Sequence, residues 1–524
     1  MKKKKHPSSQ HDQLKKIREE CFQTLEDINA FTNYLTDPTT SPANPPIQDV
    51  QTSVSALKVG IGRSADVIFR PLGFSKMPNS TLVFIKDRLS KKELAEQILR
   101  PLFNVEENLL SSRGNINETL NLLERTIAVD EIKKLQTLPD VTAEVISGNA
   151  ILLLDDMLAA FSLSISQYKG RSVGKTTVEN VIMGPLDAFV EDLETNLALV
   201  RQRVRDETFQ VEILQIGSKT QTKVALLSIG SRVNPSVLAR LKLELSNIHV
   251  DAVVSSGHLA QMLNPGVISI FPTHISTERP DRTVMALLDG RIAVIVNNTP
   301  FVLLLPTAYL DFFRAVEDRY VPWVPATAVR ILRTLSNHIT ALGPAIYIIL
   351  AGYNPSLMVP KFQLALASAR ALVPYSPLVE MLLVLLLTEI LVEATVRSPK
   401  VIGNALPIVG GIIIGNVLNS THLANQLALV IAALATVAQF TSTDPSIQTV
   451  LRINKYWFVV WTGFFGAMGL MIAAALELGY MASLESVGVP YFAPAAPFRL
   501  RETLTSKLVL PSRWEAGSPV KRTF

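Results

Sequence analysis

Acidic side chains inside an apolar run are the residues of this sequence best suited to a chemical role. The run SPLVEMLLVLLLTEILVEATVRSP at 376–399 is long enough to cross a hydrocarbon core, and it contains Glu380, Glu389 and Glu393. Carboxylates at membrane depth are costly, so they usually face protein or water. Glu389 and Glu393 are four residues apart and share one helix face, whereas Glu380 lies about half a turn away round the helix.

Two interpretations of these glutamates stay open from the sequence. In the first, they hold the helix at the membrane interface or pair internally, for instance with Arg397. In the second, Glu380, Glu389 and Glu393 line a polar path that attracts cations, and in a symmetric oligomer they would form carboxylate rings.

The other motifs give no enzyme signature. GRSVGKTT at 170–177 departs from a Walker A loop, because only three residues separate Gly170 from Gly174 and no helix-forming run follows. The seven histidines are scattered, and none forms a ligand pair at helical spacing. No Gly-x-Ser-x-Gly or Cys/His arrangement indicates a nucleophile. We therefore expect no enzyme activity, no metal site and no cofactor.

Apolar runs in the last third of the chain must position the glutamates. The final run, 456–480, has Glu477 as its only charge and no polar face, which is typical of a membrane span. The run 364–373 is too short to span and suits the interface. Glycines and alanines of the third and fourth runs allow close helix packing, within the chain or between subunits. The predicted helices are 334–352, 377–395, 402–419, 421–442 and 456–480.

Charge placement predicts the membrane orientation. The net charge of +5 fits basic flanks facing the cytoplasm better than nucleic-acid binding. The start, MKKKKHPSSQHDQ, has basic residues but no apolar region of a signal peptide, and the tail from 483 onward is basic. Both ends are therefore expected in the cytoplasm, which requires an even number of crossings. Five runs are candidates, so one is not a full span or 364–373 joins a re-entrant element.

Residues before the apolar third predict an α/β fold. Strand-like runs at 65–70 and 82–86 and a hairpin within 150–165 belong to a first unit. A second unit begins with a predicted helix at 184–204, followed by strand-like runs at 211–217, 223–230 and 250–256. We predict an α/β soluble N-terminal region of two subdomains, followed by an α-helical transmembrane bundle of four to six membrane segments. The predicted divisions are a disordered, basic extension and linker (1–49), α/β subdomain 1 (50–168), a linker (169–183), α/β subdomain 2 (184–305), the transmembrane domain (306–482) and a basic tail (483–524).

Several sequence blocks resemble one known family, the A subunits of bacterial spore germinant receptors (the GerA family). The TERPDR and PYFAP…PFR patterns are the most specific of them, and the glutamate-bearing segment also looks like its family counterpart. The resemblance covers roughly 180–500. The blocks are GPLDAFVEDLETNLALVRQRV (184–204), FPTHISTERPDR (271–282), DGRIAVIVNNTPFVLLLPT (289–307), LLTEILVEATVRSP (386–399) and SVGVPYFAPAAPFRL (486–500).

This resemblance implies a multi-pass protein of the inner spore membrane. It implies an oligomeric, nutrient-gated ion channel, with a pentamer as the family likeness suggests, that acts with a transporter-like B subunit and a lipoprotein C subunit. A SpoVAF-like accessory channel subunit and a non-conducting membrane scaffold are the alternatives, and a secondary transporter would need inverted repeats and more spans than the sequence offers. Glu278, Arg279, Asp281 and Arg282 lie beside the apolar hairpin that leads to the membrane, where they would serve domain coupling, subunit contact or a structural salt-bridge turn.

Overall fold

In a computed structural model, the described residues of the chain form two compact units. Unit 1 comprises residues 1–62 and 67–167, and unit 2 comprises 63–66 and 168–524. The basic extension and most of the C-terminal tail lie outside the described residues. The structure describes residues 46–496 apart from 48, 75–76, 89–91, 93, 105–114, 130, 156, 165–173, 177, 180, 182, 264–268, 399–405 and 494–495.

Unit 1 is an antiparallel sheet with helices on both faces. Its strand order is β1-β2-β4-β5-β3, and the predicted hairpin is confirmed as β4 paired with β5. Every residue of β2 and β4 is buried, because apolar side chains of separate core clusters cover the two faces of the sheet. The strands are β1 (Val67–Pro71), β2 (Thr81–Ile85), β3 (Ile132–Leu135), β4 (Ala150–Leu153) and β5 (Ala160–Leu163), and the α-helices are α2 (Val50–Val59), α4 (Arg100–Asn104), α6 (Ile116–Thr126) and α7 (Leu138–Ser147).

Unit 2 begins with a second antiparallel sheet in the order β10-β12-β11-β9-β8. One face packs on α8 and α11, and the other packs on α9 and α10. The strands are β8 (Phe209–Ile216), β9 (Thr222–Ile229), β10 (Ile275–Thr277), β11 (Ile292–Val296) and β12 (Val302–Leu305), with a small ribbon of β6 (Gly174–Lys175) and β7 (Asp187–Ala188). The helices are α8 (Leu193–Arg203), α9 (Pro235–Ser246), α10 (Ser256–Met262) and α11 (Pro280–Leu288).

Two predictions within this sheet region need correction. The predicted strand at 250–256 is wrong, because its backbone bonds to the turn between β8 and β9 rather than to a strand: Ser218 N donates to Val250 O at 2.9 Å. The predicted helix at 184–204 is shorter than expected. It begins after Asp192, whose carboxylate accepts a hydrogen bond from Thr195 N at 2.8 Å and so caps α8.

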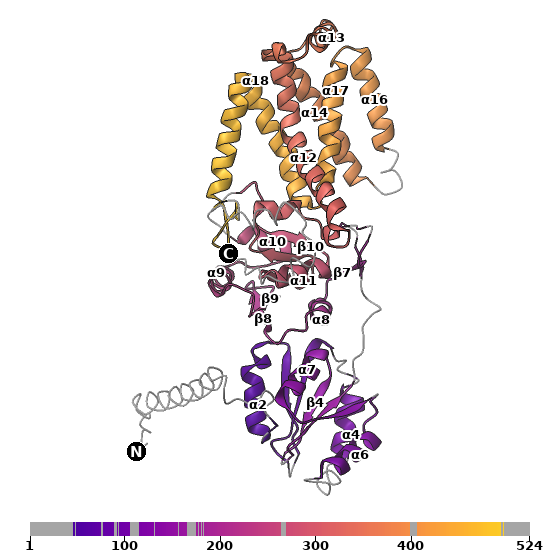
Figure 1. Cartoon of the computed structure of the whole chain (residues 1–524), viewed down its shortest axis with the longest axis vertical. Helices are drawn as coiled ribbons and strands as arrows, with labels where there is room; N and C mark the ends of the chain where they lie inside the picture. The colour runs from indigo at the N-terminus through magenta and orange to yellow at the C-terminus, as the bar shows by residue number, and fades with distance from the viewer. Residues whose placement is uncertain are drawn as a thin grey trace, which may run out of the picture. The chain divides into compact units, whose positions relative to one another are not determined.

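A helical bundle follows the sheet (Figure 1). Among the described residues, two helices are long and apolar enough to cross a membrane, Trp323–Tyr353 and Pro445–Ser483. The helix α14 has a suitable length but holds three glutamates, and α16 and α17 are apolar but shorter. The bundle helices are α12 (Trp323–Ile348), α13 (Pro360–Arg370), α14 (Pro377–Arg397), α16 (Leu406–Ser420), α17 (Gln426–Ala438) and α18 (Pro445–Ser483).

The helix α18 is folded back on itself at Gly466, where φ is 61° and ψ is −140°. Asn454 Nδ2 donates to Glu477 Oε1 at 2.7 Å, although a straight helix would separate these residues by about 35 Å. Trp457 Nε1 likewise reaches Ala473 O at 3.3 Å. The prediction of one straight span at 456–480 is therefore wrong: α18 is a hairpin of two antiparallel arms, which meet at their upper end in Figure 1.

Both ends of this hairpin are held in the core of the second sheet. Ile447 and Val450 of the first arm, and Met481 of the second, belong to the same buried cluster as β9, β11 and α8. The ring of Tyr491, which is fully buried, closes the cluster after the second arm. The sheet and the hairpin therefore share one apolar core.

Candidate functional site

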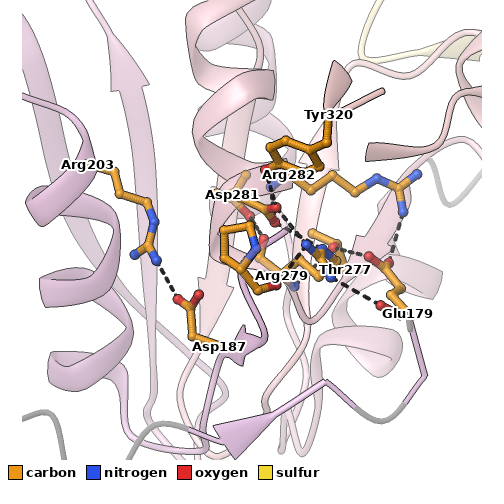
Figure 2. A network of polar contacts seen from close by, with 10 residues as sticks. Glu179, Asp187, Arg203, Thr277, Arg279, Asp281, Arg282 and Tyr320 are labelled. Atoms are coloured by element: carbon orange, nitrogen blue, oxygen red, sulfur yellow. Dashed lines mark hydrogen bonds and ion pairs between the residues drawn. The ribbon is translucent and has the colours of Figure 1, made fainter. Parts of the chain in front are cut away.

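A buried polar network surrounds the TERPDR segment, between the end of β10 and the start of α11 (Figure 2). Pro280 occupies the first turn of α11, where its missing N–H costs nothing and its fixed φ favours the helix. The four residues predicted for coupling, Glu278, Arg279, Asp281 and Arg282, are brought together here. We call this set of side chains, with Glu179, Tyr320 and Asp444, the junction network.

Arg279 and Asp281 form the centre of the junction network. The Arg279 side chain is 1% exposed, and it binds both carboxylate oxygens of Asp281, at 3.0 Å through Nε and 2.7 Å through Nη2. It also donates to the backbone oxygens of Glu179 and Pro185, at 3.3 and 3.1 Å. Tyr320, just before α12, donates its hydroxyl to Asp281 at 2.6 Å. One guanidinium thus fixes the linker, the start of α11 and the approach to the bundle.

Arg282 extends the junction network to the bundle. Its guanidinium contacts Glu179 at 2.9 Å and Asp444 at 3.7 Å, and all three side chains are nearly buried. Asp444 caps α18 by accepting from Ser446 N at 2.9 Å. Arg282 therefore connects the sheet, the linker before β7 and the first turn of the hairpin through charge.

Glu278 holds the linker by a different contact. Its carboxylate accepts from the backbone N–H groups of Val178 and Glu179 at 2.7 and 2.9 Å. Its own carbonyl accepts from Phe189 N at 2.8 Å. The segment around 178–189 is thus bound at two points to the residue before Arg279.

Burial sets the proton affinities of two acids in the junction network. Burial raises the pKa of the Glu179 carboxyl above its usual range, opposed by the Arg282 charge and the Thr277 hydroxyl. Burial also raises the pKa of Asp444, again opposed by Arg282. Both carboxyls therefore depend on Arg282 to stay ionised, because a buried charge without a partner is costly.

The glutamates at the C-terminal end of α14 form an ion-pair cluster with the first arm of α18. Glu389 pairs with Lys455 at 2.8 Å and also with Arg452. Glu393 pairs with Arg452 at 2.9 Å and with Arg397 at 2.7 Å. The Lys455 side chain is fully buried, so Glu389 compensates a charge that has left water.

Glu380 lies apart from these two glutamates, within the interior of the bundle. Its side chain is fully buried and accepts from Tyr347 Oη at 3.1 Å and from Asn425 N at 2.6 Å. Asn425 Nδ2 in turn donates to Tyr347 Oη at 2.5 Å, and Arg370 Nε approaches Glu380 at 3.8 Å. In the single chain, Glu380 therefore contacts protein, and its predicted place on a path stays a prediction.

Several partners in these clusters were not found from the sequence. Lys455 and Arg452 precede the predicted start of the last span, although their charges beside an apolar run were a visible signal. Asp444, directly before a proline, had the pattern of a helix cap. Glu179 gave no sequence signal. Among the residues that the structure describes, no group of three or more His, Cys, Asp or Glu side chains is placed to hold a metal ion.

Comparison with known proteins places the chain in a family. The family model described as Bacillus/Clostridium GerA spore germination protein matches residues 55–519. Spore germination protein KA of Bacillus subtilis (strain 168) is 30% identical over 448 residues, covering 85% of this chain and 81% of that protein. The membrane protein YfkQ of the same organism is 29% identical over 463 residues, covering 88% of each chain.

A solved structure also matches. The N-terminal domain of the A subunit of the Bacillus megaterium spore germinant receptor GerK3 aligns at 24% identity with a TM-score of 0.41, covering 51% of this chain and 99% of that domain. The family is shown by the match along 55–519 and by the identity with protein KA. This chain belongs to the GerA family of spore germination proteins.

Proposed function

We propose that this chain is the A subunit of a spore germinant receptor, in which several copies form a nutrient-gated ion channel in the inner spore membrane. Family membership supports a role in spore germination. The observation that carries the channel proposal is the ion pair of the fully buried Lys455 with Glu389, whose side chain is 19% exposed, in a bundle of apolar helices. A transporter-like B subunit and a lipoprotein C subunit are the proposed partners.

The contacts within the bundle support an even number of membrane crossings. Arg333 of α12 reaches Asp318 next to the sheet, whereas the far end of this helix meets the hairpin turn, where Tyr353 Oη donates to Gly463 O at 2.6 Å. α14 then returns, and its last turns meet the first arm of α18. With α16, α17 and the two arms of α18, the described bundle offers six passages, which place the start of α12 and the end of α18 on the same side, beside the sheet.

The proposed resting state keeps its carboxylates neutralised. Glu389 and Glu393 share Arg452, and Lys455 adds a second positive charge beside Glu389. A cation-attracting path requires those carboxylates to face water without their basic partners. Opening would therefore separate α14 from the first arm of α18, and nutrient binding to a partner subunit would shift this closed–open equilibrium.

The helix α16 supports self-association. It packs mainly on α14, and most of its apolar side chains stay exposed in the single chain, including Ile408, Ile412 and Ile413. A Cβ placed on Gly411 or Gly415 would meet nothing within 4 Å. This face suits close packing against another copy of the chain in lipid, where small residues allow helices to approach.

The junction network supports a route from the sheet to the bundle. Arg282 joins the linker carboxylate of Glu179 to Asp444 at the first turn of α18. Because both hairpin ends also share the core of the sheet, a displacement of α11 would move the arm that carries Arg452 and Lys455. We therefore assign the TERPDR segment the role of coupling within the subunit.

Single-channel recording of the purified chain in planar bilayers tests the proposal. We expect cation conductance that falls by about tenfold or more in the double variant Glu389→Gln with Glu393→Gln. Glu131→Gln, in the exposed ion pair of unit 1, is the matched control and should conduct normally. Absence of conductance, alone and with both partners, would favour the non-conducting scaffold. Conductance that ignores nutrients even with the partners present would favour a SpoVAF-like accessory subunit.

A further inference from the structure

A groove on the second sheet lies beside a strand edge that is open only in its middle. The groove has a volume of about 530 Å³ and lies between β8 and the C-terminal half of α9. Its size falls in the range of sites that hold a peptide side chain or small ligand. Leu214 and Ile216 of β8 and Leu243 and Leu245 of α9 supply the apolar part of its lining, and the ion pair of Lys242 with Glu212 supplies a charged part.

The edge of β8 is closed at both ends by the chain itself. At one end, Val211 N donates to Ser64 Oγ at 2.9 Å instead of to a strand, and Val211 O accepts from Ala65 N at 2.8 Å. At the other end, Ser218 N donates to Val250 O at 2.9 Å. Along an antiparallel edge strand, every second residue directs its backbone N–H and C=O away from the neighbouring strand. Ile213 and Gln215 therefore direct these groups away from β9, as Val211 does.

The backbone groups of Ile213 and Gln215 form an open edge that can pair with one more strand. No other described segment hydrogen bonds to the backbone of Ile213 or Gln215. Two apolar side chains at this edge are exposed, 39% for Ile213 and 61% for Leu243. A strand added at this edge would bury Ile213 on one face of the sheet and Leu243 in the groove on the other, and main-chain hydrogen bonds would hold it.

We propose that the chain's own C-terminal tail, through residues 503–510, occupies this edge and groove. The described chain leaves the second sheet beside α9: Glu485 contacts Arg240 at 3.4 Å, and Ala493 packs on the apolar cluster that contains Leu241 and Leu245. The seven residue steps from Ala496 to Thr503 can extend about 23 Å, which exceeds the length of α9, about 18 Å.

The tail sequence has the period of a strand with one apolar face. In TLTSKLVL, residues 503–510, leucine occupies positions 504, 508 and 510, which share one face of an extended chain. The other face carries Thr503, Thr505, Lys507 and Val509. The leucine face fits the groove, and the mostly polar face fits the exposed side of the sheet next to Ile213.

Hydrogen exchange on the full-length protein tests the added strand. The amides of Ile213 and Gln215 should exchange at least tenfold more slowly than exposed amides in the wild type. Leu508→Asp should remove this protection, because it places a charge in the groove. Val509→Asp is its matched control one position along, and it should keep the protection. Unprotected amides in the wild type, or equal loss in both variants, would overturn the proposal.

Disulfide trapping tests whether the tail belongs to the same chain. In a Cys21→Ser background, Leu243→Cys with Leu508→Cys should oxidise to a cross-linked protein of monomer mass, since a disulfide needs Cα atoms within about 7 Å. Ser236→Cys, two turns away on α9, replaces Leu243→Cys in the control and should not cross-link. A dimer band would assign the groove to the tail of another copy, and absence of any cross-link would refute occupation by the tail. This inference does not depend on channel activity.

Discussion

Replacing Arg282 by Met should destabilise unit 2 by about 3 kcal/mol at pH 7. Arg282 faces Glu179 at 2.9 Å and Asp444 at 3.7 Å, and the three side chains are 11% exposed or less. Removing one partner of a buried ion pair costs about 3–5 kcal/mol, because a buried charge is left without compensation. We take the lower limit, since the contact with Asp444 is longer than a hydrogen bond and either carboxyl can take up a proton.

The loss should depend on pH in a defined direction. The pKa values of Glu179 and Asp444 are raised in the folded protein, so each carboxyl favours folding below its unfolded-state pKa and loses that contribution as pH rises through its folded pKa. Arg282 opposes both shifts. Without it the pKa values rise further, and the difference between wild type and variant should grow as pH increases from about 4.5 toward 7.

Denaturant titration of the full chain in detergent, followed by tryptophan fluorescence, measures the free energy of unfolding. Arg203→Gln is the matched control, because Arg203 pairs with Asp187 at 2.6 Å where both side chains remain over 20% exposed. That change should cost about 1 kcal/mol or less. If Arg282→Met costs no more than the control, or if its cost is the same at pH 5 and pH 7, the reasoning about the junction network is refuted.

Three further outcomes are expected. Lys455→Met should raise the resting potassium leak of liposomes that contain the protein several-fold, because it removes the buried countercharge of Glu389. Arg397→Gln, which breaks an exposed ion pair, should change the leak little, and equal leaks in the two variants would contradict the proposed resting state. Gly466→Ala should lower the free energy of unfolding, measured by denaturant titration, by at least about 1 kcal/mol, because φ is positive there. Gly479→Ala, at a helical position where an added Cβ meets no other atom within 4 Å, should leave that free energy unchanged or raise it. Burial lowers the pKa of His274 to about 4, so the His274 contribution to stability should fall as pH drops from 6.5 toward 4, by at most about 3 kcal/mol; His274→Gln should remove this contribution and leave that of Glu179 and Asp444.

Local patterns in the sequence were enough for much of the fold. The β4–β5 hairpin and the grouping of Glu278, Arg279, Asp281 and Arg282 could be predicted because they lie within short segments. The partners Glu179 and Asp444 could not, since they are about 100 residues before and 160 residues after Arg282 and only folding brings them close.

The hairpin in α18 shows a different limit. Apolar composition is the same for one straight span and for two arms folded together, so hydropathy alone cannot separate them. Glycines at 463, 466 and 469 were the available signal, and only the positive φ of Gly466 identifies the turn. Because the predicted last span began at Tyr456, Arg452 and Lys455 lay outside it, and these two residues are the partners of Glu389.

The single-residue turn at Gly466 has a consequence for biogenesis. The two arms of α18 are joined without a polar loop, so almost no hydrophilic chain has to be carried to the other side of the bilayer when they insert. The pair can enter lipid as one unit, and folding of the sheet, which receives residues from both arms, then prevents its withdrawal.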